Sequence, residues 1–173
     1  MNISDQIQKT LIELTIDNQD VLLLLLDRDG TINRTGDATT ENEDKNFYIG
    51  TGKDNQFEKL IKLVDEEMIN FCGHVYDIPD KEGRLSKLKI VFNGEQINAG
   101  FEVHYGEDSQ GPPKPIVQFV AYAMHLTNDW VKVQREAALA RGHNTPIVEE
   151  VPETENTETV EEVKTVEEVK NDE

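Results

Sequence analysis

The pattern of apolar and polar positions predicts a chain of helices and β-hairpins. Near the N-terminus, behind Ser4 as a possible cap, apolar residues recur every three or four positions and predict a short helix; they are Ile3, Ile7, Leu11 and Leu14. The end of this segment is also compatible with a strand, because Ile12, Leu14 and Ile16 alternate.

A second helix is predicted to begin at Asp54 and to end at Gly73. The carboxylate of Asp54 can cap the free N–H groups, and Gly73 can close the far end. One apolar stripe, expected to pack on a sheet, contains Phe57, Leu60, Ile61, Val64, Met68 and Phe71. Before this helix, residues 47–51 are expected to form a brief strand and residues 36–46 a polar loop.

The segment from Lys87 to Tyr105 is predicted to be a β-hairpin. Asn93 and Gly94 can take the positive φ angles of a two-residue turn between two alternating segments, which pairs Phe92 with Glu95. One face then gathers the apolar residues Leu88, Ile90, Ile97, Phe101, Val103 and Tyr105. The other face carries Lys87, Lys89, Gln96, Asn98, Glu102 and His104.

A last apolar stripe runs through residues 116–141, after a Gly-Pro-Pro breaker at 111–113. The polar run at 127–129 favours caps over a helix interior, so the stripe forms either one kinked helix or two helices. Together these elements predict an α+β fold, with an antiparallel sheet built from two hairpins plus a short strand and covered by two or three helices. Residues 1–144 are long enough for one such domain.

Residues 145–173 differ from this body in composition. They contain eleven acidic residues against Lys164 and Lys170, no aromatic residue, and the hexapeptide TVEEVK twice. Such a segment buries too little apolar surface to offset the entropy of ordering, so a disordered acidic C-terminal tail is predicted. The tail has a net charge of −9, half of the −18 of the whole chain.

The acidic charge narrows the expected partners. It repels nucleic acids and anionic membrane surfaces and attracts a basic protein. The apolar run at residues 22–26 is far shorter than the roughly 20 residues that span a bilayer, and no leader pattern precedes it, so a cytoplasmic protein is expected. Cys72 is the only cysteine and is expected to be a buried thiol without a disulfide.

That apolar run ends in Asp27-Arg28-Asp29-Gly30-Thr31, which resembles the first motif of the haloacid dehalogenase-like phosphatases. The resemblance implies a sheet of parallel strands, Asp27 as nucleophile, Asp29 as acid and base, and a bound Mg²⁺. It covers about ten residues. The late acidic pair that completes the metal site in that family has no counterpart in the sequence, so no cofactor is expected.

The same residues also predict a hairpin turn. Asp27 suits the first position of a type I turn, Arg28 and Asp29 its centre, and Gly30 the left-handed position before Thr31 returns as a strand. The pairing of residues 22–26 distinguishes the two interpretations. An antiparallel partner at residues 32–35 indicates the turn, whereas a central parallel strand indicates the enzyme.

Metal ligands are not arranged in a recognisable site. Residues 27–32 also resemble the middle of an EF-hand loop, but that register places Leu25 first and Gly36 last, where a bidentate Glu is needed. The four histidines, His74, His104, His125 and His143, do not have the spacing of a zinc helix. No metal site is expected.

The sequence therefore predicts a non-enzymatic protein-binding domain. Its function would be that of an inhibitor or immunity-type antagonist of a basic protein, or of a small subunit in a larger assembly. The candidate partner-binding residues lie on the polar face of the second hairpin and are Lys87, Lys89, Glu102 and His104. The alternative is a Mg²⁺-dependent phosphohydrolase that uses Asp27 and Asp29.

Overall fold

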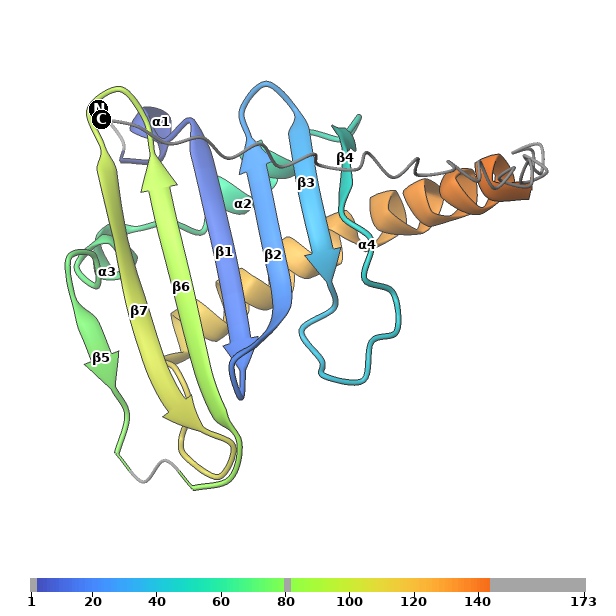
Figure 1. Ribbon diagram of the computed structural model, residues 1–173. Coiled ribbons are helices and arrows are strands. Elements are labelled where there is room, and N and C mark those ends of the chain that lie inside the picture. The colour runs from blue at the N-terminus through green and yellow to red at the C-terminus, as the bar shows by residue number, and fades with distance from the viewer. Residues whose placement is uncertain (1–2, 80–81, 144–173) are drawn as a thin grey trace, which may run out of the picture.

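The computed structural model describes residues 3–79 and 82–143, which form a seven-stranded sheet with helices on one side (Figure 1). In chain order the elements are α1 (Ile3–Gln6), β1 (Lys9–Ile16), β2 (Gln19–Asp27), β3 (Thr31–Gly36), β4 (Tyr48–Thr51), α2 (Gln56–Ile61), α3 (Glu66–Ile69), β5 (Val75–Asp77), β6 (Leu85–Asn93), β7 (Asn98–Gly106) and α4 (Lys114–His143). The α+β class is confirmed, but the sheet has more strands than predicted. The tail predicted at 145–173 lies outside the described residues.

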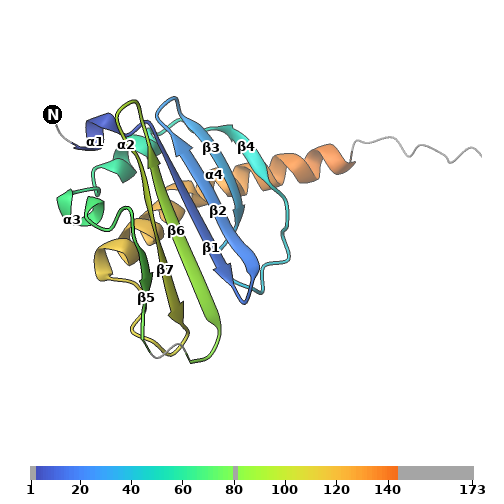
Figure 2. The ribbon, with the colours of Figure 1, turned by 60° about the vertical axis from the view of Figure 1, so that its left-hand side comes forward.

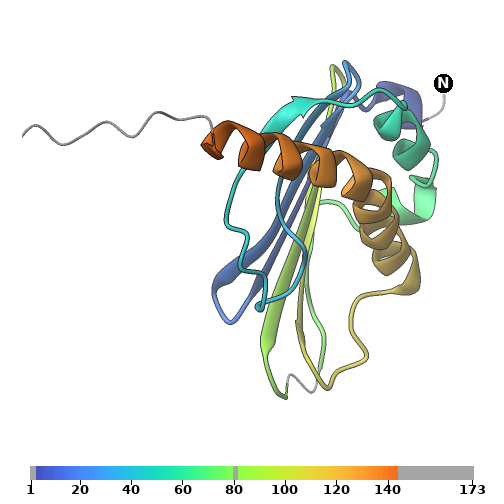
Figure 3. The ribbon, with the colours of Figure 1, turned by 90° about the vertical axis from the view of Figure 1, so that its right-hand side faces the viewer.

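The strands lie in the order β4-β3-β2-β1-β6-β7-β5, so the first strand of the chain occupies the centre. All neighbours are antiparallel except β5, which runs parallel to β7. Figures 2 and 3 show the helices on one side of the sheet, with α4 crossing it diagonally. One face of the sheet is thus covered, and no described element covers the other.

The N-terminal segment is mostly a strand, where helical spacing predicted a helix. α1 stops at Gln6, and β1 buries Thr10, Ile12 and Leu14 at the period of two expected for a strand. Asp17 and Asn18 have φ angles of 48° and 62°, which builds the two-residue turn that returns the chain as β2.

The turn between β2 and β3 has the predicted form. The N–H of Gly30 donates to the carbonyl of Asp27 at 3.0 Å, and Gly30 has a φ of +93°. Leu26 pairs with Ile32 and Leu23 with Thr35 in an antiparallel ladder. The hairpin prediction is therefore confirmed.

The β6–β7 hairpin has the predicted faces but a different register. Phe92 pairs with Ala99 rather than Glu95, and the turn is closed by the Gly94 N–H donating to the carbonyl of Ile97 at 2.7 Å. Gly94 is not among the described residues with positive φ, so the two-residue turn was wrong. The predicted faces are nevertheless correct, because the pairing partner is shifted by an even number of residues and each side chain therefore stays on the same side of the sheet.

The helix predicted from Asp54 to Gly73 is broken into α2 and α3. The side chain of Asp65 accepts a 2.9 Å hydrogen bond from the N–H of Met68 and caps α3, so a new helix begins there. Asp54 does not cap α2, whose preceding residue, Asn55, is left-handed without a side-chain cap bond. α3 ends at Ile69 rather than at Gly73, although Gly73 has a positive φ, and β5 follows as a strand that was not predicted.

α4 is one continuous helix of 30 residues, although its axis bends in the view of Figure 3. The polar residues at 127–129 do not divide it. Thr127 donates to the carbonyl of Ala123 at 2.9 Å, a back-bond that is tolerated inside helices and often bends them. Thr127 and Asn128 also accept hydrogen bonds from the buried Arg34 of β3.

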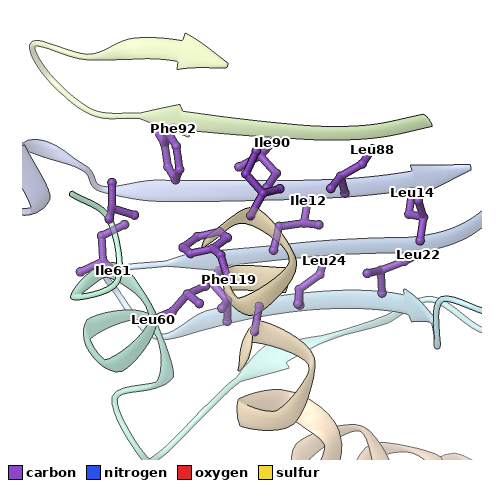
Figure 4. Close-up of a cluster of buried hydrophobic side chains, with 14 of the residues drawn as sticks. Ile12, Leu14, Leu22, Leu24, Leu60, Ile61, Leu88, Ile90, Phe92 and Phe119 are labelled. Carbon is purple, nitrogen blue, oxygen red and sulfur yellow. The ribbon is translucent and has the colours of Figure 1, made fainter. Parts of the chain in front are cut away.

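The core lies between the sheet and the helices. Figure 4 shows Ile12, Leu24 and Ile90 from three neighbouring strands pointing toward α4. The rings of Phe92 and Phe119 meet edge to face with centroids 5.8 Å apart. Cys72 is only half-buried at the margin of this core, where burial raises the pKa of its thiol.

A candidate interaction surface on the open face of the sheet

The uncovered side of the sheet, here called the open face, is built from alternate residues of its long strands. In each strand the neighbours of these residues point into the core, and the open-face side chains themselves are partly or fully exposed. The open face comprises Lys9, Leu11, Glu13 and Thr15 of β1, Leu23 and Leu25 of β2, Asn33 and Thr35 of β3, Lys87, Lys89 and Val91 of β6, and Glu102 and His104 of β7.

An apolar row crosses the middle of the open face. Leu11 pairs with Leu25 on one side and with Val91 on the other, and all three side chains are partly exposed. Leu23 adds to this row from the next open-face position of β2. At the β4 edge the row continues through Asn33 to Ile49. Partly exposed apolar side chains gathered in this way mark a surface suited to binding another protein.

Ion pairs between neighbouring strands flank this row. Lys89 Nζ lies 3.0 Å from Glu13 Oε2, and Lys87 Nζ lies 3.5 Å from Glu102 Oε2. The hydrogen bond and the charge of Glu13 raise the pKa of Lys89 above its ordinary value. The pairs hold long side chains in place, so the open face carries a fixed pattern of charges.

His104 lies between two carboxylates. Its Nε2 is 3.2 Å from Glu102 Oε2, and its Nδ1 is 3.3 Å from Asp77 Oδ1 of β5. Partial burial acts to raise the pKa of Glu102, but the hydrogen bonds and charges of His104 and Lys87 outweigh it and lower that pKa. The cluster ties the short strand β5 to the sheet.

The open face is hollowed beside this apolar row. A depression of about 270 Å³ is lined by Leu23, Thr35, Glu13 and the two lysines of β6, among others. A second one, of about 340 Å³, extends from β5 across β7 to β6 and includes Val75, Glu102 and Val91. Lys89 lines both depressions, so they adjoin across β6.

Acidic residues gather in the loops at one end of the sheet, the lower end in Figure 1. The described loops and turns there, together with the start of β2, carry Asp17, Asp20, Asp37, Glu41, Glu43, Asp44, Glu82, Glu107 and Asp108. Among the same described residues, only Lys45 and Arg84 offset them. The open face is therefore bordered by a region of negative potential.

Asp27 and Asp29 lie at the opposite end of the sheet. Asp27 forms a 3.0 Å ion pair with Lys9, and Asp29 accepts a 2.8 Å hydrogen bond from the N–H of Thr31. Bonds from Thr31 lower the pKa of Asp29. Because β2 is antiparallel to both its neighbours, it is not the parallel strand that the phosphatase resemblance implies. Within residues 3–79 and 82–143, no three His, Cys, Asp or Glu side chains are placed so that they could together hold a metal ion.

The structure brings the four predicted partner-binding residues together. Lys87 pairs with His104 and Lys89 with Glu102 across β6 and β7. Sequence reasoning missed the part of the site contributed by β1, above all Leu11 and Glu13, because Leu11 was assigned to a helical stripe. The alternation noted for neighbouring Ile12, Leu14 and Ile16 was the signal that placed Leu11 and Glu13 on the opposite face.

Comparisons with known proteins assign no family to this chain. No protein-family model matches it, and no curated protein matches its sequence. None of the helices in the described part of the chain is both long and apolar enough to cross a membrane.

Proposed function

We propose that the protein is a non-enzymatic protein-binding domain whose open face binds a basic protein partner. It would act as an inhibitor or immunity-type antagonist of that partner, or as a small subunit of a larger assembly. The alternative, a Mg²⁺-dependent phosphohydrolase using Asp27 and Asp29, gains no support from the geometry of β2.

The observation that carries the proposal is the one-sided cover of the sheet. All four described helices lie on one face, while the other presents a partly exposed apolar row between ordered ion pairs. Burying Leu11, Leu25 and Val91 against a partner would remove apolar surface from water, which is the main favourable contribution to association. The flanking charges would supply orientation and specificity.

Charge supports a basic partner. The chain has a net charge of −18, and acidic loops border one end of the open face. A field of this sign attracts a basic surface at long range and accelerates productive encounter. The lysines of the open face are each paired with a carboxylate, so they add little repulsion.

The test is affinity capture from native lysate with a matched pair of variants. Leu25→Lys places a charge in the apolar row, and Leu63→Lys places the same change at an exposed site between α2 and α3, on the helical side. We expect the wild type and Leu63→Lys to retain the same basic protein at a fixed stoichiometry and Leu25→Lys to lose it. Thermal melting of both variants confirms that each is folded.

The captured protein is then purified and titrated against the same three chains by calorimetry. Equal affinity for Leu25→Lys and the wild type would contradict binding on the open face. Failure to retain any basic protein would contradict the proposed function itself.

A further inference from the structure

A second surface lies at the β4 edge of the sheet, away from the middle of the open face. β4 has no strand neighbour on its outer side among the described residues, and its sequence, Tyr-Ile-Gly-Thr, contains no charge. The free N–H and C=O groups of an edge strand can pair with another chain. Natural edge strands usually prevent this pairing with lysine, proline or a covering element. β4 exposes apolar side chains instead, with Ile49 64% and the preceding Phe47 50% exposed.

The backbone of Ile49 is directed outward. The N–H of Gly52 donates to the carbonyl of Gly30 at 2.9 Å, which fixes the side of β4 that bonds to β3. Bonding groups alternate along an antiparallel strand, so those of Gly50 and Tyr48 also face β3, and those of Ile49 and Thr51 face away. The carbonyl of Thr51 accepts a 3.1 Å bond from Trp130 Nε1 of α4. No described residue bonds in this way to the outward N–H or C=O group of Ile49.

α4 continues beyond this edge. Trp130 lies against β4, and the 13 residues that follow it to His143, here called the overhang, project past the sheet in Figures 1 and 2. At 1.5 Å per residue the overhang is about 20 Å long, room for several strands at their usual spacing. Val133 and Leu139 on it are 58% and 61% exposed. The helix therefore extends the covered side of the sheet past the last strand.

The overhang and the loop that leads into β4 carry opposite charges. The overhang has Lys132, Arg135 and Arg141 against Glu136, whereas the loop at residues 37–47 has Asp37, Glu41, Glu43 and Asp44 against Lys45. Within one chain the two segments already meet in the 2.7 Å pair of Arg135 with Asp44. A surface holding both charges beside an unpaired strand is complementary to a copy of itself.

We propose that the β4 edge and the overhang form a two-fold interface with a second copy of this chain. β4 pairs antiparallel with the partner's β4 near Ile49, which joins the two sheets. Each overhang lies on the helical side of the other copy's edge, and this contact covers the Val133 of that overhang. The acidic loop of each copy faces the basic overhang of the other. The middle of the open face stays free, so this interface does not depend on the proposed function.

Sedimentation velocity of the full chain over a range of concentrations tests the proposal. We expect a reversible dimer and, for Ile49→Lys, a dissociation constant raised roughly tenfold or more, since the charge has no place in a paired, apolar edge. Val75→Lys is the matched control at the opposite edge, where Val75 is 60% exposed, and should dimerise as the wild type does. A chain that remains monomeric, or an Ile49→Lys variant that dimerises normally, would overturn the proposal.

Cysteine cross-linking tests the pairing itself. Hydrogen-bonded residues facing each other in an antiparallel pair have Cα atoms about 5.5 Å apart, within the range of a disulfide. In a Cys72→Ala background, Ile49→Cys should oxidise to a covalent dimer, whereas Val75→Cys should not. Equal cross-linking of the two variants, or none for Ile49→Cys, would exclude β4 pairing.

Discussion

Nη1 of the buried Arg34 donates a 2.7 Å hydrogen bond to Oγ1 of Thr127, in the middle of α4. The same nitrogen also lies 2.9 Å from Asn128 Oδ1 and 3.1 Å from the carbonyl of Met124. Burial lowers the pKa of Arg34, and the charge of Asp37 opposes that effect. One guanidinium thus joins β3 to the helix, through acceptors that lie 90 to 94 residues away in the chain.

Removing either partner of this contact should destabilise the protein. We expect Arg34→Met and Thr127→Val each to lower the free energy of unfolding by about 1–3 kcal/mol, because each removes a buried hydrogen bond made by a charged guanidinium. The double variant should cost less than the sum of the two. Urea denaturation measures all three. The exposed Arg84–Thr40 bond of 2.8 Å is the matched control, and its double-variant cycle should show almost no coupling.

Two glycines with positive φ should respond differently to alanine. Gly36 has a φ of +80°, and a Cβ there would overlap the carbonyl of Val21 on β2, whereas the nearest atom to a Cβ on Gly30 is 3.6 Å away. Gly30→Ala should therefore cost about 1 kcal/mol from backbone strain alone. Gly36→Ala should cost clearly more. Equal melting temperatures for the two variants would contradict this difference.

Asp44 should contribute to acid sensitivity. Partial burial acts to raise its pKa, but hydrogen bonds from Asn46, Arg135 and Tyr48 outweigh it and lower the pKa below the ordinary 3.8. The folded state therefore binds fewer protons than the unfolded state in that range, and stability falls as the pH drops. The contribution is present above pH 3.8 and is lost as the pH passes through the folded pKa.

Chemical denaturation at a series of pH values checks this sign. Asp44→Asn should flatten the acid limb of the stability profile. Asp20→Asn, at an exposed aspartate in the first part of β2, should leave the limb unchanged. A profile for Asp44→Asn as steep as that of the wild type would show that Asp44 is not responsible.

Asp27→Asn tests the phosphohydrolase alternative. We expect no Mg²⁺-dependent hydrolysis of small phosphate esters by the wild type, because Asp27 lies at a hairpin turn and forms an ion pair with Lys9. The substitution should change stability by less than about 1 kcal/mol, as is usual for a partly exposed ion pair. Hydrolysis by the wild type that disappears in Asp27→Asn would instead establish the enzyme.

Deletion of residues 145–173 should slow binding to a basic partner. The deletion removes half of the net charge of −18 and so weakens long-range attraction. Stopped-flow association with the captured partner should be slower for the shortened chain at low salt. The two rates should converge as salt shortens the screening length. A difference that persists at high salt would indicate direct contact by the segment.

Local patterns predicted the parts of the fold that local chemistry determines. The Asp27–Gly30 turn and the two faces of the second hairpin each follow from a few adjacent residues. The same is true of Lys87, Lys89, Glu102 and His104, whose common face depends only on alternation.

Non-local contacts determined what the sequence did not reveal. The spacing of Leu11 and Leu14 fits a helix, but pairing on both sides with β2 and β6 makes the segment a strand. Thr127 and Asn128 predicted a break in the helix. No adjacent residue shows that their side chains instead accept hydrogen bonds from Arg34 of β3. Asp65 is a residue type that commonly caps helices, but the apolar stripe continues on both sides of it and therefore predicted one unbroken helix.

The central place of β1 has a consequence for folding during synthesis. The strands from β1 to β4 follow one another in the chain, so this half of the sheet can assemble from short loops. β6, which pairs with the other side of β1, is made only after β5 has emerged, and closing that long loop is slow. Until then β1 is an unpaired edge strand of the nascent chain, and Ile12 is not yet covered by α4. A chain that stops before residue 85 should therefore aggregate at this strand, and the ribosome-bound protein should be a client for chaperones that bind exposed apolar strands.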